Sequence, residues 1–167
     1  MPVSHVTDGF RLAYDRAGAG PPAVLLHGWP GDRRDYRQVA PRLTGLDVVV
    51  PDLRGFGESD QHLADPAAAY SAAAQARSVI ALIEELDLRD VVIAGYDIGS
   101  RIAQMVAATR PGLLRGLVTS STMRRCGCCR QLVISHRWRH RTSSRRRSWR
   151  QRAWPATAGN EAPCGAA

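Results

Sequence analysis

Short apolar runs alternate with helical patterns along the first 120 residues of this 167-residue chain. That alternation limits the possible fold more than any other feature. Strands are predicted over 9–18 (an edge strand), 23–28, 46–52, 90–96 and 114–121, and helices near 36–43, over 65–88 and over 98–110. The side chains predicted to face inward from the helices are Tyr36, Val39, Ala40, Leu43, Val79, Ile80, Ile83, Leu86, Ile102, Met105 and Val106. The pattern favours the α/β class, with a mostly parallel sheet covered by helices on both faces.

The composition changes near Met123. Residues 1–123 hold 12 Arg against 14 acidic residues, whereas residues 124–167 hold 11 Arg against one acid, Glu161. The net charge of +8 therefore comes entirely from the second part, which also contains all four cysteines. We divide the chain into an N-terminal globular domain, 1–123, and a basic tail, 124–167, which is expected to be disordered or out of frame.

The N-terminal residues show no basic region followed by an apolar stretch, so no secretory signal is predicted. No apolar run approaches the roughly 18 residues that a membrane helix requires. With nearly half of its residues hydrophobic, the chain has a globular composition. These features predict a cytoplasmic protein without a membrane partner.

Three polar or glycine-rich segments follow predicted strands directly: 27–31, 52–60 and the turn at Asp97. In parallel sheets, ligands bind at the carboxyl ends of the strands. These segments therefore predict one ligand site on one rim of the sheet.

The segment "GYDIG", 95–99, has the form of a nucleophile elbow, in which a tight strand-to-helix turn presents its central side chain. Side chains flanking such a turn would collide with neighbouring backbone, and Gly95 and Gly99 avoid this collision. The simpler alternative is that Asp97 only caps the following helix.

The motifs "HGWPG" (27–31), "DLRGFGESD" (52–60) and "GYDIGSRIAQ" (95–104) occur in this order. Over roughly residues 9–122 the chain resembles the α/β-hydrolase family, and within it the soluble epoxide hydrolases most closely. The resemblance implies a hydrolase that opens an epoxide through an ester with Asp97. It also implies a small-molecule substrate, an epoxide or an organohalide, and no cofactor.

A carboxylate with an ordinary pKa of about 4 is already ionised at neutral pH, so Asp97 needs no base to attack a saturated carbon. The resemblance implies that the backbone N–H groups of Trp29 and Ile98 form the oxyanion hole. It also implies a structural role for His27. Asp52 and Arg54 are expected to brace their loop. The Trp29 side chain is expected either to line the substrate pocket or to pack in the core.

In the family, a histidine and an acid from late strands complete the reaction, and a cap domain supplies two tyrosines. None of these is recognisable downstream of Ser121. His136 and His140 follow no convincing strand and have no plausible acid partner. The sequence therefore predicts a truncated α/β-hydrolase fold with absent or impaired turnover. A dehalogenase-like hydrolase is the alternative, because the same nucleophile can expel a halide.

The tail allows three interpretations. Arginine and tryptophan side chains could bind nucleic acid, which would make the protein a basic nucleic-acid-binding fragment. Cys126, Cys128 and Cys129 could bind a metal with His136 or His140, although their spacing does not give paired C-x-x-C ligands. We favour the third interpretation, translation in a shifted reading frame, because the chain has 23 Arg and no Lys and its hydrophobic periodicity is lost near residue 123. Nucleic-acid and metal binding are disfavoured.

Overall fold

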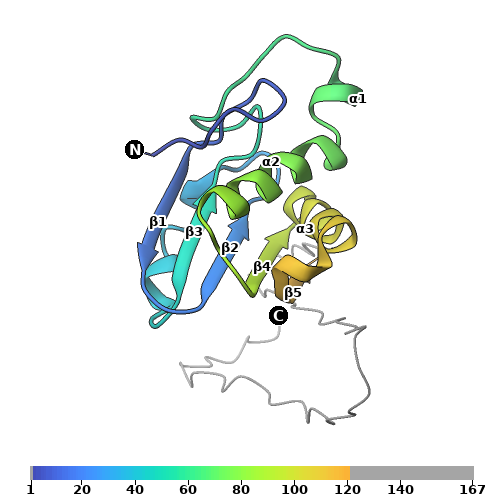
Figure 1. The fold of residues 1–167 in the computed structure, drawn as a ribbon. Helices are drawn as coiled ribbons and strands as arrows, with labels where there is room; N and C mark the ends of the chain where they lie inside the picture. Colours follow the sequence, from blue (N-terminus) through green and yellow to red (C-terminus); the bar gives the residue numbers. More distant parts are fainter. Residues whose placement is uncertain (1, 121–167) are drawn as a thin grey trace, which may run out of the picture.

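A computed structural model of the protein describes residues 2–120, which form a sheet with helices packed on it (Figure 1). The strands are β1 (Tyr14–Gly18), β2 (Pro22–Leu26), β3 (Asp47–Pro51), β4 (Val91–Tyr96) and β5 (Leu114–Ser120). The α-helices are α1 (Pro66–Ala69), α2 (Ala72–Glu85) and α3 (Ile98–Thr109), and the 3-10 helices are η1 (Arg33–Tyr36), η2 (Ala40–Arg42) and η3 (Pro111–Leu113).

The strand order in the sheet is β1-β3-β2-β4-β5. β1 pairs with β3 antiparallel, and the other three pairings are parallel. The prediction of an α/β fold with a mostly parallel sheet is confirmed, and β1 lies at the edge as expected. Leu26 pairs with Gly95, so the chain leaves β2 and β4 at neighbouring points of one rim.

Both faces of the central strands are buried, which explains their continuous apolar runs. On one face, Val24, Leu26 and Ile93 belong to the main core, which includes the buried side chains of α2 and α3. On the other face, Leu25, Val48 and Val50 form a smaller cluster. This smaller cluster packs against partly buried side chains of the segment between β2 and β3, namely Tyr36, Ala40, Leu43 and Leu46.

The prediction of an α-helix near residues 36–43 is wrong. This segment instead forms η1 and η2, whose backbone bonds span three residues, as from Arg42 N to Val39 O. Pro41 explains the difference, because it has no N–H to donate and its ring would clash with the carbonyl of Arg37 in an α-helix. Tyr36, Ala40 and Leu43 still pack inward as predicted, whereas Val39 is 44% exposed.

The single helix predicted over 65–88 is interrupted between α1 and α2. Ser71 starts α2 as its N-cap, with its side chain accepting from Ala74 N at 3.3 Å. Tyr70, just before it, bonds through its hydroxyl to the backbone of His62, at 2.6 Å to the carbonyl and 2.8 Å to the N–H. These local side-chain bonds compete with a continuous helix.

Met105 was predicted to face inward from α3, but it is 36% exposed. The buried stripe of α3 runs through Ile102, Ala103 and Val106. At 100° per residue, Met105 falls at the margin of that stripe. The apolar spacing correctly predicted the helix, but the predicted buried stripe included one residue too many, Met105.

Several predictions concern residues outside the described range. They include the basic tail, 124–167, with His136, His140 and the cysteines. Within residues 2–120, no helix has the length and apolar character needed to cross a membrane, and no group of three or more acidic, His or Cys residues is arranged to hold a metal ion. The cytoplasmic location stays a prediction.

Candidate active site

Asp97 lies in the turn between β4 and α3, in a strained backbone conformation with φ 51° and ψ −121°. A Cβ placed on Gly95 would lie 2.5 Å from the Gly99 carbonyl, and one on Gly99 would lie 2.4 Å from Leu26 O. No side chain fits at such distances. The predicted reason for the two glycines is therefore confirmed. Because Gly95 has no side chain, the turn can close tightly, and because Gly99 has none, the start of α3 can pack against the end of β2.

The side chain of Asp97 does not cap α3, although the residue occupies the N-cap position. Its Oδ2 instead accepts a hydrogen bond from the backbone N–H of Trp29, at 3.0 Å. Asp97 itself is exposed. The simple alternative, an aspartate that serves only as a helix cap, does not describe this geometry.

The two predicted oxyanion-hole residues come from different elements. Trp29 comes from the loop after β2 and contacts Asp97 through its backbone N–H. Ile98 is the first residue of α3, so its N–H has no acceptor within the helix. The Trp29 side chain is 69% exposed, so the expectation that it packs in the core is wrong.

His27 is fully buried, with both ring nitrogens engaged. Its Nε2 accepts from Leu53 N at 3.0 Å, so its Nδ1 must carry the proton that it donates to Gly28 O at 2.9 Å. The ring thereby ties the loop after β2 to the loop after β3 and lies edge-on to Phe56. These contacts agree with the structural role that the family resemblance implied.

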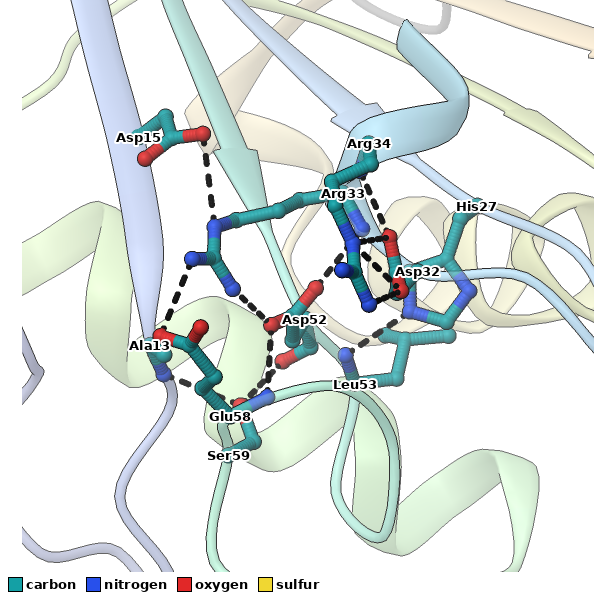
Figure 2. Close-up of polar contacts among 10 residues, drawn as sticks. All are labelled: Ala13, Asp15, His27, Asp32, Arg33, Arg34, Asp52, Leu53, Glu58 and Ser59. Atoms are coloured by element: carbon teal, nitrogen blue, oxygen red, sulfur yellow. Dashed lines mark hydrogen bonds and ion pairs between the residues drawn. The ribbon is translucent and has the colours of Figure 1, made fainter. Parts of the chain in front are cut away.

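Asp52 is also fully buried and organises the loop after β3 (Figure 2). Its carboxylate accepts from Arg33 N at 2.6 Å and Glu58 N at 2.9 Å, and it pairs with the Arg33 guanidinium. Arg33 also pairs with Asp15 at 3.3 Å and with Glu58 at 3.0 Å; Figure 2 marks both contacts with dashed lines. The bracing role predicted for Asp52 is thus confirmed, whereas sequence reasoning missed Arg33, its main partner.

Arg54 braces the same loop through different partners. Its buried guanidinium donates to Ser78 Oγ at 2.7 Å and to Asp8 Oδ2 at 3.0 Å, and it lies 4.7 Å from the centroid of the Phe10 ring. The side chain therefore joins α2 to the N-terminal segment. Its predicted bracing role is confirmed.

A contact beside the candidate nucleophile escaped the sequence reasoning. The Tyr96 hydroxyl donates to Asp35 Oδ2 at 2.5 Å. Burial first, and the hydrogen bond to Asp35 second, raise the pKa of Tyr96 to about 12. Tyr96 belongs to the recognised 95–104 motif and Asp35 follows the 27–31 motif by four residues, but nothing in the spacing indicated that they meet.

A mostly parallel sheet with a glycine-flanked residue at a tight strand-to-helix turn is typical of the α/β-hydrolase fold. The family model for the alpha/beta hydrolase fold matches residues 21–149, and the chain belongs to this family. The match continues past residue 122, where the motif-based resemblance ended.

Individual relatives agree with this assignment. The chain is 37% identical over 97 residues to a soluble epoxide hydrolase from Corynebacterium sp., covering 58% of this chain and 32% of the relative. It is 34% identical over 108 residues to a haloalkane dehalogenase from Mesorhizobium japonicum, covering 64% and 34%. The crystal structure of an epoxide hydrolase from Vigna radiata aligns with a TM-score of 0.66 at 25% identity, covering 71% of this chain and 37% of that one. The chain thus spans about a third of the length of these curated relatives.

Proposed function

We propose that this protein is an epoxide hydrolase-like enzyme in which the Asp97 carboxylate attacks the substrate. The observation that carries the proposal is the 3.0 Å hydrogen bond from Trp29 N–H to Asp97 Oδ2. It engages one carboxylate oxygen and leaves the other, on an exposed residue, available for attack. The similarity to epoxide hydrolases from two organisms supports the choice of substrate class.

In the first step, Asp97 Oδ1 forms a bond to one epoxide carbon while the carbon–oxygen bond of the ring breaks. The electron pair of that bond stays on the epoxide oxygen, which then takes a proton from water. The product is a hydroxyalkyl ester of Asp97. A carboxylate suits this displacement because it is ionised at neutral pH without the help of a base.

In the second step, water attacks the ester carbonyl carbon, and the diol leaves with the oxygen that was Oδ1. The carbonyl oxygen of the ester is then Oδ2, which already accepts from Trp29 N–H. Trp29 and Ile98 N–H groups would stabilise the negative charge that develops on this oxygen.

Hydrolysis of the ester by this chain is proposed to be slow, because it needs a base to activate water. The described histidines make contacts elsewhere: His27 with Gly28 and Leu53, His5 with Glu85, and His62 with Gly9. The ester should consequently accumulate.

Intact-mass measurement after treatment with a small epoxide tests the proposal. The protein should gain the mass of one epoxide, Asp97→Asn should gain none, and peptide mapping should place the adduct on Asp97. Asp65→Asn is the matched control, because Asp65 is an exposed aspartate that caps α1 through a hydrogen bond to Ala67 N, and it should behave as wild type. Equal adduct formation in wild type and Asp97→Asn would refute the proposal.

Dehalogenation is the second candidate, favoured by the similarity to a haloalkane dehalogenase. Asp97 Oδ1 would then form an alkyl ester while the carbon–halogen bond breaks and halide leaves with the electron pair, in place of the hydroxyalkyl ester formed from an epoxide. A haloalkane that modifies Asp97 and releases one halide, where epoxides of similar size do not react, would favour this alternative.

Nucleic-acid binding by residues 124–167 stays a separate prediction. Salt-sensitive binding to arbitrary DNA that is lost when these residues are deleted would support it.

A further inference from the structure

Tyr96 and Asp35 connect the nucleophile turn to the loop that carries Trp29. Tyr96 is the last residue of β4, directly before Asp97, and Asp35 lies in η1, four residues after Gly31, the end of the 27–31 motif. We infer that the hydrogen bond between them is a clamp that positions the Trp29 N–H on the Asp97 carboxylate. The inference rests on the proposed function, since it assigns Tyr96 and Asp35 as positioning residues for that site.

The loop backbone passes directly over the clamp. A Cβ on Gly28 would lie 2.3 Å from Tyr96 Cε2, and a Cβ on Gly31 would lie 1.7 Å from Asp35 Oδ2 and 3.1 Å from the Tyr96 hydroxyl. Trp29 lies between these two glycines. The loop is thus held against the Tyr96 ring at one end and against the Asp35 carboxylate at the other.

A second tyrosine fixes η1 to the sheet. The Tyr36 hydroxyl donates to Leu26 O at 3.0 Å, at the end of β2, and its ring lies edge-on to that of Tyr96, with centroids 6.1 Å apart. Because Tyr36 neighbours Asp35, this bond anchors the acceptor of the clamp. Two side-chain bonds from neighbouring residues of η1, Asp35 to Tyr96 and Tyr36 to Leu26, therefore fix the position of η1 relative to β4 and β2.

The clamp matters because the contact it supports is a single hydrogen bond. Among residues 2–120, Trp29 N–H is the one donor that bonds to the Asp97 carboxylate. The Trp29 side chain, at 69% exposed, adds little packing to hold the loop. Without the Tyr96–Asp35 bond, the loop could move away from Asp97, and small displacements at a reacting centre have large effects on rate.

The test compares Tyr96→Phe, Asp35→Ala and the double variant in the full chain. Two quantities are measured: the rate of Asp97 adduct formation with a small epoxide, and hydrogen exchange of the Trp29 amide by NMR. Each single variant should slow adduct formation about tenfold and speed amide exchange about tenfold. The double variant should be no worse than either single one, because both remove the same bond.

Two control variants separate positioning from general loss of structure. Asp35→Asn keeps an oxygen that can accept from the Tyr96 hydroxyl, so it should restore both quantities to within about threefold of wild type. Tyr70→Phe removes a hydroxyl that bonds to the His62 backbone, away from Asp97, and should change neither quantity.

The outcomes distinguish failure of the clamp from failure of the proposed function. If Tyr96→Phe behaves as Tyr70→Phe in both measurements while wild type still modifies Asp97, the clamp is refuted and the proposed function stands. If wild type forms no adduct, the proposed function fails. The exchange rate of the Trp29 amide then still decides whether the clamp holds the loop, with unchanged exchange in Tyr96→Phe refuting it.

Discussion

The backbone N–H of Trp29 donates to Asp97 Oδ2 at 3.0 Å, across 68 residues of sequence. This bond joins the loop after β2 to the turn after β4, two neighbouring strands whose carboxyl ends meet at one rim. It also separates the two oxygens of Asp97 chemically, because one is hydrogen-bonded and the other is available.

Gly99→Ala should destabilise the protein by about 1–3 kcal/mol, because the new methyl group would lie 2.4 Å from Leu26 O and 2.5 Å from His27 O. The sign of the change is informative, because replacing glycine by alanine inside a helix would otherwise stabilise the protein by up to about 1 kcal/mol. Urea denaturation measures the effect. Gly116→Ala, whose nearest atom would be at 3.7 Å, is the control, and equal effects of the two substitutions would contradict the account of the turn.

Arg54→Met should cost about 2–4 kcal/mol in the free energy of unfolding. The substitution keeps an apolar stem but removes the buried bond to Ser78 and the partly buried bond to Asp8. Arg77 also bonds to Asp8, at 2.6 Å, but its side chain is 52% exposed, so Arg77→Met should cost about 1 kcal/mol or less. If thermal and urea denaturation gave the two variants similar losses, the bracing role of Arg54 would be wrong.

Stability should fall at alkaline pH as Tyr96 ionises. Its folded-state pKa is raised from 10 to about 12, so its contribution is present below pH 10 and is lost as the pH rises through about 12. Tyr96→Phe should make this decline shallower without abolishing it, because burial also raises the pKa of Tyr36. Urea denaturation at pH values between 10 and 12, with Tyr70→Phe as the control, measures the slope. An identical alkaline decline in Tyr96→Phe and wild type would contradict the assignment.

The central strands β2, β3 and β4 were predictable because they are buried on both faces and leave an apolar run in the sequence. The structure of the segment between β2 and β3 was not predictable in the same way. The spacing of its apolar residues indicated an α-helix, but Pro41 prevents an α-helix there and the segment forms 3-10 turns. The break before α2 was missed for a similar reason. Ser71 competes locally with the helix, and such a contribution is not visible in the hydrophobic pattern.

The site was partly predictable. Gly95, Asp97 and Gly99 form a local motif whose spacing indicates the tight turn, and the close approach of Gly95 is to its sequence neighbour Gly99. The close approach of Gly99 is to Leu26 and His27, at the end of the neighbouring strand β2, and depends on strand pairing. The Tyr96–Asp35 bond spans 61 residues, and its formation depends on how the strands pair. A contact between residues so far apart cannot be predicted from one sequence unless a family motif includes both residues.

Isotope labelling of Asp97 tests the central claim most directly. The protein is incubated with a small epoxide in ¹⁸O-water, and the peptide containing Asp97 is analysed by mass spectrometry over time. We predict an unlabelled ester at first, and then, as water attacks the ester carbonyl, slow appearance of one ¹⁸O in Asp97, while the first diol released carries no label. Diol that contains ¹⁸O from the first turnover, with Asp97 unmodified and unlabelled throughout, would contradict the account.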